Sequence, residues 1–359
     1  MNKNEITNIL IGLSIQYDFK ITIEELKNKY NEKHRHYHTW DNHIVPMIES
    51  ITDDYKNKKF LEIKTYDWEG NLSIKDKELN KEIYEKLLIA TLFHDIIYDP
   101  KSETNEKDSI VFMIKNITAS DEFIEDVSEM ILSTINHNSK NIFIKYDLEI
   151  LTKDFSKLLE WEKQIQSEYS FVNWSHYKTE RIKILNKLQS APIEKINING
   201  IDTLIEVIKT TVPKVGIYAG SFNPFHIGHM DILNKANNIF DKIIIVKGLN
   251  IKKHFDTYEY TREYQKLKEL LPEYEVVSHK GLLTDFIKEQ KDVDITLIRG
   301  LRNGTDLEVE NVQSAFMKDM YPELKVVYIR SEKELEHISS SAIRELRAYN
   351  EELVKKYLP

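Results

Sequence analysis

The chain has 359 residues, of which 41% are hydrophobic, and its formal net charge is −9. This length predicts two domains or one large domain. The negative charge argues against a nucleic-acid binder that relies on a broad basic face. The absence of cysteine excludes disulfides, thiolate nucleophiles and zinc sites that depend on sulfur. Any metal must therefore be held by histidine and carboxylate side chains.

The sequence shows no export signal, and no apolar stretch approaches the roughly 18 to 20 residues needed to cross a bilayer. Its N-terminal apolar run is short, and acidic residues follow without a small-residue cleavage site. We expect a cytoplasmic protein that binds neither membranes nor nucleic acid. Its expected ligands are small phosphorylated molecules.

The first 190 residues predict a helical domain. Apolar residues recur three and four positions apart over 85–99, 122–138 and 155–169, which is the helical period. Glycine is nearly absent from this part of the chain. The pattern then breaks in a segment with proline, asparagine and glycine, so residues 191–213 are expected to form a linker.

From Lys214 onward, short β-rich runs alternate with helical stretches. Strict alternation of this kind predicts a parallel sheet wound with helices. We therefore expect an α/β fold of the Rossmann type over 214–359. The β-rich runs cover residues 214–220, 242–249, 274–279, 295–300 and 324–330.

The segment 216–233, GIYAGSFNPFHIGHMDIL, combines the end of a predicted strand, a loop and the start of a helix. In a doubly wound sheet, ligands bind at the carboxyl ends of strands, where a helix N-terminus offers free amides to phosphate. His226 and His229 lie three positions apart on the first helical turn and can donate hydrogen bonds to phosphate oxygens. This segment predicts a nucleotide site.

Three further motifs follow along the chain. Arg299 and Arg302 lie in IRGLRNGTDLEVE, and the planar fork of arginine suits phosphate oxygens. The loop GLNIKKHFD carries Lys253. The serines of EHISSSAIREL open a predicted helix, and their hydroxyls and amides suit the β- and γ-phosphates of ATP.

In this order, the four motifs resemble the nucleotidyltransferase superfamily, and the R-G-L-R stretch and lysine loop are similar to bacterial phosphopantetheine adenylyltransferase. The resemblance implies AMP transfer from ATP to 4′-phosphopantetheine, giving dephospho-coenzyme A and pyrophosphate, with Mg²⁺ bound mainly through the triphosphate. The implied catalytic residues are His229, Lys253 and Arg302. The implied acceptor contacts are Ser221, Lys253, Leu283 and Arg299. The implied ATP contacts are Ser221, Phe222, His226, His229, Gly300, Leu301, Arg302, Glu310, Leu335, Ser339, Ser340 and Ser341.

Departures from the family pattern leave a second acceptor open. Ser221 replaces the usual threonine, Ala219 the usual proline and Asn223 the usual aspartate. His226 stands where many phosphopantetheine enzymes have threonine. The H-x-G-H and I-S-S-S-x-I-R motifs are also the style of nicotinamide mononucleotide enzymes. Nicotinamide mononucleotide is therefore the alternative acceptor.

His94 and Asp95 are adjacent within an apolar helical segment, FHDII, where burying an unpaired charge is expensive, so the pair indicates a metal site. With an upstream R-x-Y-H-x-x-x-x-H run and a later Y-D…N-E…S segment, residues 30–188 resemble the HD superfamily of metal-dependent phosphohydrolases. The implied ligands are His43, His94, Asp95 and, as the fourth, Asp154, with His137 as an extra ligand of a second metal. These ligand types suit Mn²⁺, Fe or Zn²⁺. The metal would activate water for attack on a phosphate ester.

The expected architecture is multidomain, with an all-α HD-type domain over 1–190, a linker over 191–213 and a Rossmann-like nucleotidyltransferase domain over 214–359. Two interpretations of the helical domain stay open. It is either a second, metal-dependent enzyme, which makes the chain bifunctional, or a noncatalytic module for nucleotide sensing or assembly. Relatives of the C-terminal domain often form hexamers, so a homo-oligomer is expected.

Overall fold

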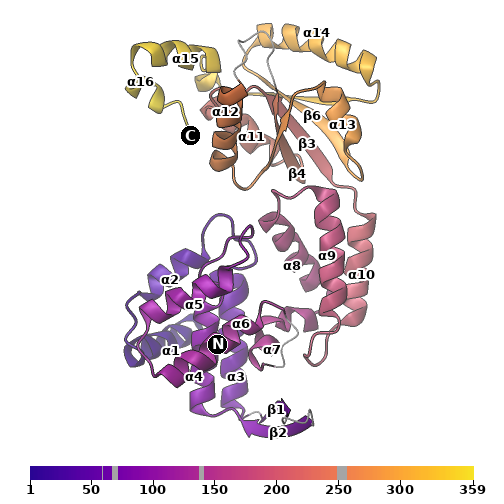
Figure 1. Cartoon of the computed structure of the whole chain (residues 1–359). Helices are drawn as coiled ribbons and strands as arrows, with labels where there is room; N and C mark the ends of the chain where they lie inside the picture. The colour runs from indigo at the N-terminus through magenta and orange to yellow at the C-terminus, as the bar shows by residue number, and fades with distance from the viewer. Residues whose placement is uncertain (59, 67–71, 137–140, 249–256) are drawn as a thin grey trace. The chain divides into compact units, whose positions relative to one another are not determined.

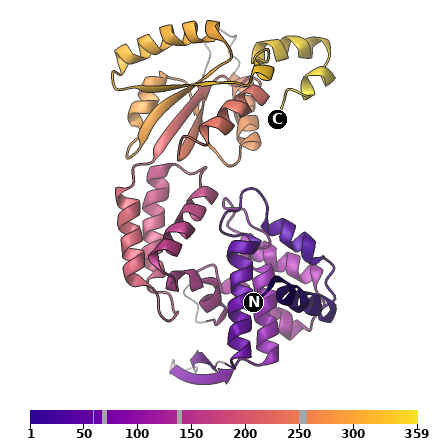
Figure 2. The same cartoon turned by 180° about the vertical axis from the view of Figure 1, so that it is seen from behind.

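Two compact units make up the described part of the chain (Figures 1 and 2). The computed structural model describes residues 1–58, 60–66, 72–136, 141–248 and 257–359. The helical unit comprises Met1–Tyr169 and Glu180–Lys209, and the α/β unit comprises Ser170–Thr179 and Thr210–Pro359. Each unit has hydrophobic cores of its own.

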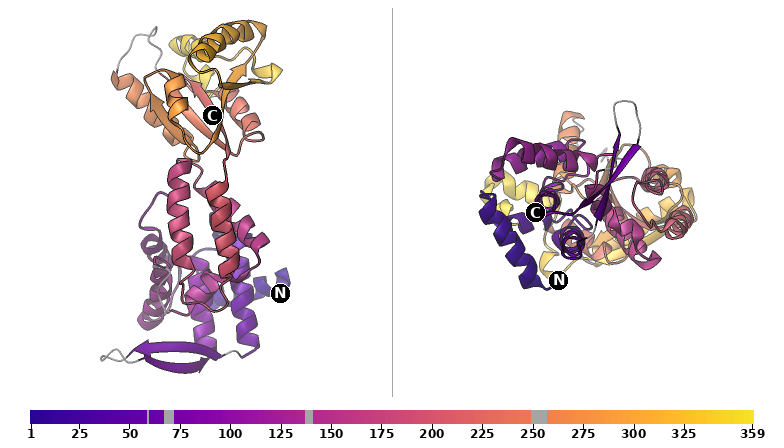
Figure 3. Two further views of the ribbon diagram at one scale, coloured as in Figure 1. Left: turned by 90° about the vertical axis from the view of Figure 1, so that its right-hand side faces the viewer. Right: turned by 90° about the horizontal axis from the view of Figure 1, so that it is seen from below.

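The helical unit is built mainly from α-helices and one antiparallel hairpin. The hairpin strands, β1 and β2, lie at one end of α3 and α4 (Figures 1 and 3). Among the described residues, no helix is both long enough and apolar enough to span a bilayer. The elements are α1 (Lys3–Gln16), α2 (Ile23–Tyr30), η1 (Trp40–Ile44), α3 (Val45–Lys56), β1 (Phe60–Tyr66), β2 (Leu72–Glu78), α4 (Lys81–Phe93), α5 (Asn105–Asn116), α6 (Asp121–Ser133), α7 (Phe143–Asp147), η2 (Glu149–Thr152), α8 (Phe155–Glu168), α9 (Trp174–Leu188), which begins in the α/β unit, and α10 (Ile198–Thr210).

Helix α4 forms the centre of the helical unit. Its residues from Leu87 to Phe93 are buried all round the helix, whereas a surface helix would bury only one stripe. Helices α3, α5 and α6 pack against it. Because His94 and Asp95 follow the last residue of α4, they are held inside the unit rather than at its surface.

The boundary between the units differs from the expected linker over 191–213. Most of that segment is helix α10, which belongs to the helical unit up to Lys209. Its apolar residues recur at helical spacing, and Ile205 is buried in the same core as Leu158. The expectation of a linker was wrong because α10 has an apolar face that is covered by α8 and α9.

The α/β unit contains a five-stranded, all-parallel sheet with the strand order β5-β4-β3-β6-β7. This confirms the predicted alternation of strands and helices. The elements are β3 (Lys214–Gly220), α11 (Ile227–Ala236), β4 (Lys242–Gly248), α12 (Thr257–Leu270), β5 (Glu275–His279), α13 (Leu283–Glu289), β6 (Asp294–Leu301), α14 (Gly304–Met320), β7 (Lys325–Arg330), η3 (Lys333–Leu335), α15 (Ser340–Tyr349) and α16 (Glu352–Lys355).

Strand β3 lies at the centre of the sheet and carries side chains into two cores. Val215 and Ile217 pack with α13 on one face, and Tyr218 packs with α11 and α12 on the other. From β3 the chain proceeds to β4 and β5 on one side, and then crosses to β6 and β7 on the other side. The strand order therefore reverses between β3 and β6. In open parallel sheets, ligands bind outside the carboxyl ends of the strands at such a point.

Candidate active sites

Two histidines cap the N-terminus of α11 at the carboxyl end of β3. The backbone N–H of His229 donates to Nδ1 of His226 at 3.3 Å, and the backbone N–H of His226 donates to Nδ1 of His229 at 3.2 Å. The two rings stack with centroids 3.6 Å apart. A Cβ at Gly228 would lie 3.1 Å from the His226 ring, so glycine leaves room for this arrangement.

This capping arrangement sets the tautomer and charge of both rings. Because both Nδ1 atoms accept backbone hydrogen bonds, each neutral imidazole carries its proton on Nε2. Burial, together with the nearby Arg302 charge, lowers the pKa of His226 to about 4. Burial also lowers the pKa of His229 well below its usual range, and His226 and Arg302 add to this effect. At neutral pH the site thus offers two uncharged Nε2–H donors.

Aromatic packing of Phe222 fixes the loop between β3 and α11. Phe222 is 3% exposed and has a φ of 42°, in the left-handed region. Its ring contacts His229 edge-on, with centroids 5.1 Å apart. A Cβ at Gly220 would lie 2.9 Å from the Phe222 ring, so glycine is needed at the end of β3. The Phe222 side chain, expected to contact ATP, is therefore packed under the loop and supports His229.

Lys247, which is not among the residues predicted from the sequence, contacts the same loop. It is 2% exposed at the carboxyl end of β4, and its Nζ donates to the backbone carbonyl of Ser221 at 2.6 Å. Tyr260 Oη donates to the Lys247 carbonyl at 2.8 Å. The available signal was a lysine directly after four consecutive apolar residues in KIIIVKG, a strand buried on both faces.

Both predicted arginines lie at the carboxyl end of β6 and are held by carboxylates. Arg302 donates from Nε and Nη2 to the two carboxylate oxygens of Asp306, each at 2.8 Å. Arg299 forms a similar fork with Glu310, with Nη2 2.7 Å from Oε1. Glu310, expected to contact ATP, instead orients Arg299 in this structure. The two guanidinium groups are thus fixed beside the first two turns of α14.

The serine motif is bonded directly to the histidine loop. Ser339 is the N-cap of α15, and its Oγ accepts from the Ala342 N–H at 3.1 Å. Ser340 Oγ donates to the carbonyl of Pro224 at 2.9 Å. Arg344 also donates to the Asn223 carbonyl. These bonds bring the start of α15 to the loop that precedes α11.

The other predicted contacts of this site lie at the ends or starts of neighbouring strands and helices. Gly300 and Leu301 end β6, and a Cβ at Gly300 would lie 3.1 Å from Ile232, so glycine lets α11 approach the strand. Leu283 begins α13, Leu335 ends η3, Ser341 lies in the first turn of α15, and Lys253 lies outside the described residues. The structure therefore unites three of the four motifs at the switch point of the sheet.

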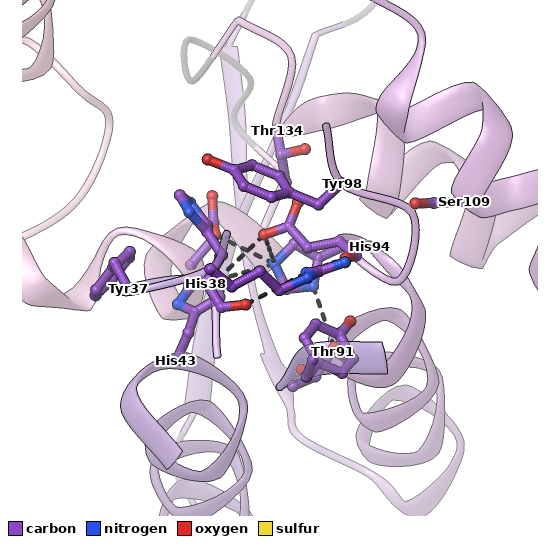
Figure 4. A network of polar contacts seen from close by, with 12 residues as sticks. Tyr37, His38, His43, Thr91, His94, Tyr98, Ser109 and Thr134 are labelled. Atoms are coloured by element: carbon purple, nitrogen blue, oxygen red, sulfur yellow. Dashed lines mark hydrogen bonds and ion pairs between the residues drawn. The ribbon is translucent and has the colours of Figure 1, made fainter. Parts of the chain in front are cut away.

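A second cluster lies in the helical unit, where His43, His94 and Asp95 converge (Figure 4). The two Nε2 atoms of His43 and His94 are 2.9 Å apart. Oδ2 of Asp95 lies 3.1 Å from Nε2 of His94 and 3.7 Å from Nε2 of His43. Two imidazole nitrogens and a carboxylate oxygen directed at one point are ligands suited to a divalent transition metal.

The structure does not bring Asp154, the fourth ligand expected from the sequence, to this cluster. Asp154 is exposed and caps α8, where Oδ1 accepts from the Lys157 N–H at 3.1 Å. The aspartate that approaches the cluster is Asp147, the last residue of α7, with Oδ1 3.4 Å from Nε2 of His43 and 3.7 Å from Nε2 of His94. His137, expected as an extra ligand, lies outside the described residues.

The neighbours of the cluster orient its ligands. Nδ1 of His94 lies 3.1 Å from the carbonyl of Thr91, so a proton on Nδ1 leaves the Nε2 lone pair facing the cluster. Burial alone would lower the pKa of His94, but Asp95 and Asp147 outweigh it and raise the pKa to about 9. Arg35 donates to the Asp95 carbonyl at 2.8 Å and so holds the turn after α4.

Glu168 organises the segment that precedes His43. Its Oε1 accepts the backbone N–H groups of His36, Tyr37 and His38, at 2.8, 2.8 and 3.0 Å. Its Oε2 accepts from Tyr98 Oη at 2.7 Å and lies 2.6 Å from Nδ1 of His38. Burial would raise the pKa of Glu168, but His38 outweighs it and lowers the pKa to about 2. This buried carboxylate explains the tyrosine and histidine of the R-x-Y-H run as structural supports of the cluster.

The sheet and its site define a nucleotidyltransferase domain, and residues 217–346 match the Cytidylyltransferase-like family model. The phosphopantetheine adenylyltransferase of Mycoplasma mycoides is 37% identical over 139 residues, which are 38% of this chain and 98% of the relative. That of Cytophaga hutchinsonii is 38% identical over 148 residues, 41% of this chain and 97% of the relative. The solved nicotinic acid mononucleotide adenylyltransferase of Plasmodium falciparum is 17% identical, with 40% of this chain and 90% of that chain aligned and a TM-score of 0.30. Through its C-terminal part, the chain belongs to the phosphopantetheine adenylyltransferase family.

Proposed function

We propose that the α/β unit transfers AMP from ATP to 4′-phosphopantetheine, giving dephospho-coenzyme A and pyrophosphate. The observation that carries this proposal is the meeting of His226, His229 and Arg302 at the switch point of the sheet. The identity with curated phosphopantetheine adenylyltransferases supports the choice of acceptor.

The reaction needs alignment and charge stabilisation more than covalent chemistry. An acceptor phosphate oxygen bonds to the α-phosphorus of ATP, the bond from that phosphorus to the bridging oxygen breaks, and pyrophosphate leaves. His229 would donate from Nε2–H to an α-phosphate oxygen, and Arg302 would balance the charge of the triphosphate. Lys253 keeps its proposed role at the acceptor phosphate. Mg²⁺ accompanies the triphosphate.

Lys247 adds a positioning role to this site. Its buried ammonium group fixes the Ser221 carbonyl and thereby the hydroxyl proposed to hold the acceptor phosphate. A hydrogen bond from a charged donor contributes about 1.5–3 kcal/mol. The loop would therefore be oriented before the acceptor binds.

A mass-spectrometric acceptor screen tests the proposed transfer. The full chain is incubated with ATP, Mg²⁺ and a panel of phosphate monoesters that includes 4′-phosphopantetheine and nicotinamide mononucleotide. We expect dephospho-coenzyme A as the main adenylylated product. His226, which the sequence shares with the nicotinamide mononucleotide enzymes, makes the dinucleotide the alternative product. Adenylylation of neither acceptor would contradict the proposal.

We propose that the helical unit is a metal-dependent phosphohydrolase of the HD type. His43, His94, Asp95 and Asp147 would hold a divalent ion, Mn²⁺, Fe or Zn²⁺, which when bound supplies an activated water. The support is the convergence of their ligand atoms within a buried site, together with the carbonyl that orients His94.

Metal analysis separates the enzyme from a noncatalytic helical module. We expect the purified protein to contain a transition metal by plasma mass spectrometry, and the His94→Ala variant to lack it. Release of phosphate from a monoester by the wild-type protein, lost in that variant, would support hydrolysis. Metal-free protein that behaves like His94→Ala would instead favour a sensing or assembly module.

We propose that the α/β unit associates with copies of itself. Val309, Val312, Phe316 and Met320 form an exposed apolar stripe along α14, and Phe316 is 65% exposed. Light scattering after gel filtration is expected to show an oligomer for the wild type and a smaller species for Phe316→Asp. An unchanged mass would contradict self-association through α14.

A further inference from the structure

A cavity of about 330 Å³ lies beside His43 and Asp147. Its walls come from η1, α3, α7, η2 and α8, all within the helical unit. This volume is at the lower end of the roughly 300–1,000 Å³ found for small-molecule sites. A substrate with its phosphate at the cluster would therefore place its organic part in this cavity.

The uncharged part of the cavity lining is largely apolar and aromatic. Tyr37, Met47 and Trp161 contribute to it, and the rings of Tyr37 and Trp161 meet edge to face with centroids 6.1 Å apart. Asn42 and Gln164 add neutral hydrogen-bonding groups. On such a surface, burial of carbon-rich groups makes the free energy of binding more favourable, and burial of unpaired charge makes it less favourable.

The charged part of the lining is more acidic than basic. Lys157 pairs with Glu160 at 2.8 Å, and Lys153 pairs with Glu149. Asp41 also lines the cavity, as does Asp147. Both lysines therefore already face carboxylates. Of the two further carboxylates, Asp147 faces the proposed metal ion and Asp41 is left over. A second phosphate on the substrate would meet an excess of negative charge.

We infer that the helical unit hydrolyses monophosphate esters whose organic part is uncharged or cationic, and that it discriminates against nucleoside di- and triphosphates. The inference rests on the phosphohydrolase function proposed above. In the reaction, a water oxygen bonds to phosphorus, the phosphorus–oxygen ester bond breaks, the released alcohol takes a proton and inorganic phosphate leaves.

The two units would then act on the same chemical class. 4′-Phosphopantetheine, the acceptor proposed for the α/β unit, is a monophosphate with an uncharged organic part. Its adenylylated product is a diphosphate ester and falls outside the class. The helical unit would remove phosphate from molecules of the kind that the α/β unit adenylylates, and would spare the product.

Phosphate release by the full chain tests the inference. With Mn²⁺ as the metal, the substrates are 4′-phosphopantetheine, phosphoethanolamine, AMP, ADP and ATP, each supplied alone so that no adenylyl transfer occurs. We expect kcat/KM for the three monophosphates to exceed that for ADP and ATP at least tenfold. Equal or better hydrolysis of ADP or ATP overturns the inference but leaves the phosphohydrolase function standing. No phosphate release from any ester overturns both.

A charge-reversal variant tests the physical cause. Glu160→Lys should raise kcat/KM for ADP relative to AMP at least threefold. Glu125→Lys, at an exposed position of α6 that does not line the cavity, should leave the ratio unchanged. An unchanged ratio in a folded Glu160→Lys protein contradicts the role of the acidic lining.

A fluorescence titration tests where the organic part binds, because tryptophan emission reports binding without turnover. Pantetheine should change it saturably in the wild type and not in Trp161→Phe, and no change in the wild type contradicts the placement of the organic part.

Discussion

Each unit places two histidines in close contact, but the groups around them prepare opposite chemistry. In the α/β unit, His226 and His229 accept backbone N–H groups at Nδ1, and burial and Arg302 lower their pKa values. Their remaining nitrogens are therefore donors suited to phosphate oxygens.

In the helical unit, His43 and His94 direct Nε2 atoms toward each other and toward Asp95. The carboxylates raise the pKa of His94 to about 9, so a proton competes for the position that a cation would take. The comparison teaches that the partner of the second ring nitrogen and the sign of the nearby charge decide what a histidine pair can do.

The largest expected effect comes from removing one donor of the neutral pair. His229→Ala should lower kcat for dephospho-coenzyme A formation by about 10² to 10³, the usual cost of losing a donor to a transition-state oxygen. His176→Ala, at an exposed position of the same unit, serves as the control. Turnover of His229→Ala within threefold of wild type would contradict the donor role of His229 in the α/β unit.

Two aspartates test the cluster around His43 and His94: Asp147, which approaches it in the structure, and Asp154, which the sequence suggested. Asp147→Asn should weaken Mn²⁺ or Zn²⁺ binding about 100-fold, because it removes one charged ligand, and Asp154→Asn should leave binding unchanged. Isothermal titration of the metal-stripped proteins measures both affinities. Equal losses in the two variants would show that Asp147 has no special place.

A smaller effect is expected from Lys247, which contacts the loop that carries Ser221. Lys247→Met should raise KM for the acceptor about tenfold, since it removes a charged hydrogen bond to the Ser221 carbonyl, while KM for ATP stays the same. Steady-state kinetics with each substrate varied in turn separates the two constants. A fall in kcat with both KM values unchanged would assign Lys247 a different role.

The smallest expected effect is on stability: acid should lower the free energy of unfolding of the α/β unit. His226 has a folded-state pKa of about 4 against an ordinary value of 6.5, so the unfolded chain binds the proton first. The free energy of unfolding should therefore fall as pH drops from 6.5 to 4, by up to about 1.4 kcal/mol per pH unit for this group. Urea unfolding of wild type and His226→Asn should show a difference that shrinks on acidification. A constant difference would mean that the ring is not neutral and buried as described.

Local sequence patterns predicted the α/β unit better than the helical one. The alternation of strands and helices, the two histidines at the start of a helix and the two arginines at the end of a strand each come from a short contiguous segment, so local spacing was enough to predict them. The reciprocal cap that the two histidines form was not predicted. Lys247 was missed because one lysine in a strand reads as an exposed position, whereas here a backbone carbonyl satisfies it. Asp147 was missed because only the packing of the short helix α7 brings it to His43.

Gly200 shows how one residue type misled the domain boundary. In the sequence it marks a break, but in the structure it lies in the first turn of α10, where a Cβ would be 2.5 Å from the Asn197 side chain and 2.8 Å from Leu158 of α8. Glycine is needed there for close helix packing rather than for a flexible linker. Such a contact cannot be recognised before the packing partner is known.

The measurement that tests the account most directly is the rate of dephospho-coenzyme A formation from ATP and 4′-phosphopantetheine by wild type, His229→Ala and His94→Ala. We expect a loss of about 10² or more in His229→Ala and an unchanged rate in His94→Ala, because we propose that the two histidine pairs serve separate reactions. A near-normal rate in His229→Ala, or a comparable loss in His94→Ala, would contradict it.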